Sequence, residues 1–155
     1  MAPQRQEATA LSPNAAPVAA DSLAPLRVAL PLDLPDPAAH ERLREATVDQ
    51  LFRLGGERLV GQLLDLFAGS APERIAAIRA ASSGQELEAA ERSAHTLKSS
   101  AGNLGGMRMW AICQCLESLA MAGQLDDRYL QLVDELEREY AILEPRLRSR
   151  FGEAR

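Results

Sequence analysis

Apolar residues recur every three or four positions through most of this chain, with polar residues between them. That spacing places the apolar side chains on one face of an α-helix, whereas a half-buried strand alternates them every second residue. No segment shows the alternation of a strand. Five segments carry the helical spacing, at about 37–54, 57–81, 85–103, 107–122 and 126–150. The pattern predicts an all-α protein.

The breaks between these segments are short. Asp36 followed by Pro37 predicts the start of the first helix, because aspartate caps helices and proline suits the first turn. The helices then end at glycine-containing breaks, at 55–56, 82–84, 105–106 and 123. Short connections make consecutive helices antiparallel, so we expect an up-down four-helix bundle with the first segment as an additional N-terminal helix. Gly69 and Pro72 predict a kink or a tilt in the second segment.

Residues 1–35 differ from the rest of the chain. They are rich in alanine, contain six of the nine prolines and lack a helical period. Proline restricts its own backbone and that of the preceding residue. We therefore expect a flexible leader over 1–35 and one helical domain over 36–151. Neither a secretion signal nor a run of about 20 apolar residues is present, so we expect a cytoplasmic protein that does not bind membranes.

Charge and cysteine content narrow the function classes. The chain has 22 acidic and 17 basic residues and a formal net charge of -5, which does not favour binding to nucleic acid. Cys113 and Cys115 point to different faces of one predicted helix and are poorly placed to pair with each other. We expect them to be buried free thiols in a reducing cytoplasm.

Candidate chemistry is concentrated in the segment 85–103. Its core stripe is Leu87, Ala90, Ala94, Leu97, Ala101 and Leu104, and a stripe displaced by one residue holds Glu91, His95, Lys98, Gly102 and Gly105. One residue is about 100° around a helix, so this second stripe borders the core and can face solvent. We expect His95 and Lys98 on an exposed ridge, with Ser99 one turn beyond His95. Glycine inside a helix costs about 1 kcal/mol relative to alanine, which the close approach of another surface at Gly102 would offset.

A carboxylate is predicted beside this histidine. His95 lies ten residues before Gly105, and Glu117 lies eleven residues after Gly106. At about 1.5 Å per residue, both stand roughly 15 to 17 Å from the turn on antiparallel helices. A carboxylate that accepts the Nδ1 proton fixes the tautomer of the ring and leaves Nε2 free as a nucleophile.

The stretch 95–105, HTLKSSAGNLG, resembles the signature of histidine-containing phosphotransfer (HPt) domains in two-component phosphorelays. That signature is a histidine, a lysine three residues on, a small residue four on and a glycine ten on. The resemblance extends over about 36–150 and includes LLDLFAGSAPERIAAI and CQCLESLA. It implies that the histidine accepts a phosphoryl group from a receiver-domain aspartate and passes it to another receiver. Glycine is commoner in the family where this chain has Ser99.

The resemblance also implies roles for the neighbours of His95. Lys98 would favour the phosphorylated state, and Glu117 would orient the imidazole. The small residues that would make room for a receiver are Ser99, Gly102 and Gly105. His40 has no such neighbours, and we expect it to be an ordinary surface residue.

The implied partners are response-regulator receiver domains and a hybrid histidine kinase, and we expect a monomer. The chain has no glycine-rich nucleotide loop and no evident carboxylate cluster. We therefore expect no metal site and no cofactor of its own, with the Mg²⁺ that phosphoryl transfer needs supplied by the receiver. By itself the protein would be a phosphoryl carrier and not an enzyme. Two alternatives stay open: a helical adaptor that binds receivers without phosphotransfer, and a detached phosphotransfer portion of a histidine kinase, phosphorylated in trans.

Overall fold

The protein folds into a bundle of long helices. The structure, a computed structural model, describes residues 33–152, so nearly all of the predicted leader lies outside the described residues. The described chain contains one 3₁₀ turn, η2 (Pro37–Ala39), and the helices α2 (Glu45–Gly84), α3 (Leu87–Asn103), α4 (Met107–Met121) and α5 (Asp127–Gly152). No strand occurs among these residues.

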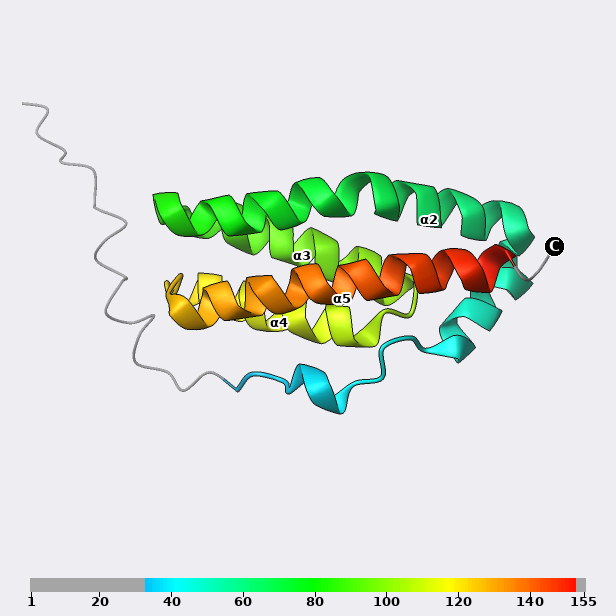
Figure 1. Ribbon diagram of the computed structural model, residues 1–155, viewed down its shortest axis with the longest axis horizontal. Coiled ribbons are helices and arrows are strands. Elements are labelled where there is room, and N and C mark those ends of the chain that lie inside the picture. The colour runs from blue at the N-terminus through cyan, green and yellow to red at the C-terminus, as the bar shows by residue number, and fades with distance from the viewer. Residues whose placement is uncertain (1–32, 153–155) are drawn as a thin grey trace, which may run out of the picture.

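The four helices are antiparallel and enclose one hydrophobic core. Helix α3 packs between α2 and α4, and α5 closes the ring by packing against α4 and α2 (Figure 1). The core is mostly aliphatic, and every helix contributes to it. The predicted core stripe of α3 is buried from Ala90 to Leu104, while Leu87 is partly buried at its edge. These observations confirm the all-α class and the four-helix bundle.

Helix α2 consists of two helical segments that meet at Gly56. The φ and ψ of Gly56 are 62° and -164°, a conformation that is essentially open only to glycine. The first segment, up to residue 55, is the additional N-terminal helix that the sequence predicts. The glycine pair thus redirects the chain without a loop.

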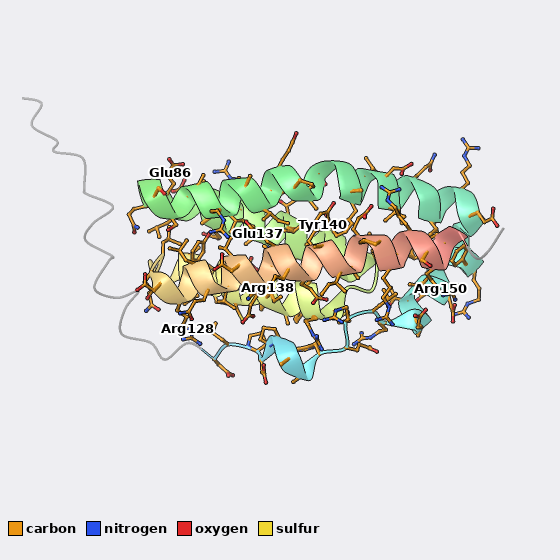
Figure 2. All side chains as sticks on the ribbon, in the orientation of Figure 1. Glu86, Arg128, Glu137, Arg138, Tyr140 and Arg150 are labelled. Atoms are coloured by element: carbon orange, nitrogen blue, oxygen red, sulfur yellow. The ribbon has the colours of Figure 1, made fainter. Side chains whose placement is uncertain are left out.

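At Gly69 and Pro72, where the sequence predicts a kink or a tilt, α2 continues without a break and its backbone dihedrals stay helical. A proline has no N–H to donate to the carbonyl four residues earlier, which here is that of Ala68. The Tyr140 hydroxyl donates to this carbonyl oxygen at 3.4 Å, and Figure 2 shows Tyr140 between α5 and α2. A hydrogen bond from a neighbouring helix therefore replaces the one that the proline removes.

The predicted start of the first helix is wrong. Asp36 does act as a cap, since its Oδ1 accepts a hydrogen bond from the backbone N of Ala38 at 3.0 Å. The turn that begins at Pro37 nevertheless ends at Ala39, and the α-helix begins only at Glu45. The local start signals produce a single 3₁₀ turn.

The segment 40–44 is held by the turn between α3 and α4. The backbone N of Arg44 donates to the carbonyl of Gly105 at 2.7 Å, and the backbone N of Arg108 donates to the carbonyl of Glu41 at 3.0 Å. A helical backbone would use these groups internally. Tertiary hydrogen bonds therefore override the helical signals of this segment.

Gly105 is buried beneath the start of α2. Its φ is +81°, and a Cβ at this position would lie 2.8 Å from the carbonyl oxygen of Arg44. Glycine is thus required by the turn and by the close approach of the backbone. The prediction that Gly105 lies on an exposed ridge is therefore wrong.

Replacing Gly105 with alanine is expected to lower the free energy of unfolding by about 1–3 kcal/mol, because a side chain at this φ is strained and meets backbone. Urea denaturation followed by circular dichroism measures the change. Gly69→Ala is the matched control, since a Cβ at residue 69 meets nothing within 4 Å and the helical position should gain about 0.4–1 kcal/mol. Equal stability of the two variants would contradict the role given to Gly105.

The chain just before η2 also contacts the bundle. Leu34 packs against the core, and the Sγ of Cys115 donates to the carbonyl of Pro35 at 3.2 Å. Cys113 and Cys115 are both free and buried, as expected. Burial raises the pKa of the Cys115 thiol to about 11, and burial also raises the pKa of Cys113. Both thiols are therefore protonated at neutral pH and behave as core side chains.

Candidate functional site

His95 lies in the middle of α3, and its side chain is 62% exposed. Its Nδ1 is 2.7 Å from Oε1 of Glu117 on α4, so the predicted neighbour is in contact with the ring. With Glu117 ionised, Nδ1 carries the proton and donates it to this hydrogen bond. No side chain within residues 33–152 hydrogen-bonds to Nε2. The free lone pair of the ring is therefore open to an incoming group.

The Glu117 carboxylate accepts hydrogen bonds from two side chains of α3. It is 8% exposed, and its Oε2 accepts a hydrogen bond from Nζ of Lys98 while its Oε1 holds His95. Burial acts to raise the pKa of the Glu117 carboxyl, but the hydrogen bonds from Lys98 and His95 outweigh it and lower this pKa below its ordinary value. The carboxylate is therefore ionised at neutral pH, with Lys98 as its counterion.

Lys98 is less exposed than its position in the second stripe predicts. Only 16% of its side chain is exposed, and Nζ also donates to Oε1 of Gln114 at 3.0 Å. The prediction of an exposed Lys98 is wrong, because the buried Glu117 draws its ammonium into the interface between α3 and α4. Of His95 and Lys98, only His95 has a largely exposed side chain.

The predicted small residues lie in three different environments. Ser99 is exposed, and its hydroxyl donates to the carbonyl of His95 at 3.2 Å. Gly102 is partly exposed, and a Cβ there would lie 3.1 Å from Cδ1 of Trp110 on α4. The surface that approaches Gly102 is thus an indole of the same chain. Because Gly105 is buried, Ser99 and the edge of Gly102 are the parts of these small residues that a partner can contact.

Three residues near His95 were missed by the sequence reasoning. Gln114 binds Lys98, Ser118 binds Gln114, and Trp110 covers Gly102. A signal for them does exist, since 110, 114 and 118 follow each other at four-residue spacing along one flank of the predicted helix. Glu117 lies next to this flank on the same helix.

Within residues 33–152 there is no group of three or more His, Cys, Asp or Glu side chains that could hold a metal ion. None of the helices in this range combines the length and apolar character needed to cross a bilayer.

Acid is expected to destabilise the fold through Glu117. The pKa of this carboxyl is lower in the folded protein than its ordinary 4.5, so its contribution to stability is fully present above about pH 4.5. The contribution is lost as the pH falls through the lower, folded pKa. Urea unfolding at a series of pH values between 7 and 3 measures it. Glu117→Gln, which cannot titrate, should show a shallower loss, and an identical slope in both proteins would contradict the assignment.

The fold and the site together define a four-helix bundle that presents one imidazole to solvent and holds it from behind with a carboxylate. A family model described as the Hpt domain matches residues 62–144, more than half of the chain. This range contains His95, Lys98 and Glu117. The chain belongs to the Hpt domain family, and its role is histidine phosphotransfer in two-component signalling.

A solved structure agrees with this family. The chain is similar to histidine-containing phosphotransfer protein B (HptB) from Pseudomonas aeruginosa PAO1, known from a crystal structure. The TM-score is 0.68 and the sequence identity is 26%, over 76% of this chain and 100% of that chain. No curated protein sequence matches this chain.

Proposed function

We propose that the protein is a phosphorelay intermediate. His95 accepts a phosphoryl group from the aspartate of one receiver domain, carried by a hybrid histidine kinase, and passes it to the receiver of a response regulator. The observation that supports this most strongly is the geometry of one ring. The imidazole of His95 is exposed and fixed through Nδ1, and its Nε2 has no partner within residues 33–152.

The reaction needs little from this chain beyond a positioned nucleophile. The lone pair of Nε2 forms a bond to phosphorus while the bond from phosphorus to the aspartyl oxygen breaks and the carboxylate leaves. Phosphoryl transfer is catalysed mainly by positioning and by charge compensation. Glu117 contributes the positioning, because it holds the ring and its tautomer. The receiver would supply Mg²⁺ and the remaining positioning groups, so the protein acts as a carrier.

Charge compensation in the phosphorylated state falls to Lys98. The phosphoryl group adds negative charge to a ring that already contacts the carboxylate of Glu117. Lys98 binds the other oxygen of the same carboxylate, so its ammonium neutralises Glu117 and stands close to the ring. The resting site therefore contains its counterion before the phosphoryl group arrives.

The test is phosphotransfer from a panel of receivers that carry radiolabelled aspartyl phosphate. The proposal predicts a label on this protein that survives alkali and is lost in acid, as a phosphoramidate is. The adaptor alternative predicts binding of a receiver with no label. The detached-kinase alternative predicts label from ATP and a purified kinase catalytic domain with no receiver present. Either of the last two results, in place of the first, would overturn the relay role.

A further inference from the structure

The hydrogen bonds at His95 continue along α4 beyond Glu117. Nζ of Lys98 donates to Oε1 of Gln114 at 3.0 Å, and Nε2 of Gln114 donates to Oγ of Ser118 at 3.1 Å. Both hydrogen bonds are partly buried. Gln114 and Ser118 are one helical turn apart, so α4 keeps them adjacent. The residues form a continuous polar chain from Ser118 to the ring.

The chemistry of Lys98 fixes the direction of this chain. A lysine ammonium can only donate, so Gln114 must turn its amide oxygen toward Lys98 and its amide nitrogen toward Ser118. Lys98 thereby has two acceptors, Oε2 of Glu117 and Oε1 of Gln114. An ammonium has three N–H donors. The two acceptors on α4 occupy two of these donors and leave the third N–H of Lys98 for another partner.

We propose that Gln114, held by Ser118, is a positioning residue for phosphotransfer at His95. It fixes the Lys98 ammonium beside the ring, so that the third N–H can bind an oxygen of the phosphoryl group. This inference rests on the proposed function of His95. An unanchored lysine side chain must lose rotamer freedom when it binds the phosphoryl group. Anchoring by Gln114 removes that loss from the transfer step.

The variant Gln114→Leu tests the proposal, because leucine keeps the size and helix preference but removes both hydrogen bonds. We expect the fraction of phosphoryl group held by His95 at equilibrium with a receiver to fall roughly three- to tenfold, the effect of one charge-assisted hydrogen bond near solvent. The KM for the receiver should not change. Ser118→Ala should act in the same direction with a smaller effect. Gln131→Leu, at an exposed position of α5, is the matched control and should match the wild type.

Repeating Gln114→Leu in a Lys98→Ala background separates positioning from structure. If Gln114 acts through the ammonium, its loss has no further effect once Lys98 is absent. A general disturbance of α4 would lower phosphorylation equally in both backgrounds. That result would overturn the proposal, as would wild-type phosphorylation of Gln114→Leu.

A second measurement is independent of phosphorylation. In the unphosphorylated protein, nuclear magnetic resonance can follow hydrogen exchange of the Lys98 ammonium with water. Exchange should be slow in the wild type and severalfold faster in Gln114→Leu, while Gln131→Leu stays like the wild type. Unchanged exchange in Gln114→Leu would overturn the proposal. Absence of label on wild-type His95 would instead count against the proposed function, and the exchange rates would still decide the role of Gln114.

Discussion

Replacing His95 with glutamine is expected to abolish phosphoryl acceptance while the bundle stays folded. The amide nitrogen of glutamine has no free lone pair, so no nucleophile remains at the end of the side chain. Because the His95 side chain is 62% exposed and the glutamine amide keeps an N–H donor for Glu117, the free energy of unfolding should change by no more than about 1 kcal/mol. Transfer from a radiolabelled receiver measures the first effect, and urea denaturation measures the second.

The chain supplies a matched control for this experiment, because it contains only two histidines. The other, His40, lies beside Trp110 with ring centroids 6.0 Å apart. His40→Gln is expected to keep the acid-labile label. A label that persists in His95→Gln and disappears in His40→Gln would show that His40 carries the phosphoryl group, and it would contradict the assignment to His95.

Replacing Glu117 with leucine is the substitution with the second largest expected effect. The ring of His95 loses the acceptor that fixes its tautomer and orientation, and we expect the rate of phosphotransfer to fall about 10- to 100-fold. Lys98 also loses its counterion in a half-buried position, which should lower the free energy of unfolding by about 1–3 kcal/mol. Single-turnover transfer kinetics and urea denaturation measure the two losses.

Glu117→Gln separates orientation from charge. The amide oxygen can still accept from Nδ1 of His95, but the amide nitrogen then meets the Lys98 ammonium, and two donors cannot bond to each other. We expect transfer within a few-fold of the wild type if orientation of the ring is the main role of Glu117. A loss as large as that of Glu117→Leu would show that the carboxylate charge is what matters.

The sequence predicts the helices well because their signals are local. The apolar period defines the four long helices, and the glycine pair at 55–56 marks the break inside α2. One local signal misled, because contacts between distant segments overrode it. Residues 40–44 bind the turn between α3 and α4 instead of continuing a helix from Pro37. The hydrogen bond from Tyr140 to the carbonyl of Ala68, near Pro72, also joins distant segments and has no signal in the sequence.

The site was partly predictable for a similar reason. Counting residues from the turn places Glu117 level with His95, and this needs only the rise of a helix. The burial of Lys98 depends on the rotation of α4 about its own axis, which a count along the chain does not give. Gly102 and Gly105 look alike in the sequence, yet one accommodates Trp110 and the other accommodates the backbone of Arg44. A small residue does not reveal whether its neighbour is another protein or the same chain.

The position of Trp110 gives this protein an optical reporter of its own. It is the single tryptophan of the chain, and it packs over Gly102, about two helical turns from His95 along α3. A receiver that covers His95 and extends to Gly102 would change the polarity around the indole. Docking can therefore be followed through the intrinsic fluorescence of the unmodified protein, provided that the receiver used contains no tryptophan.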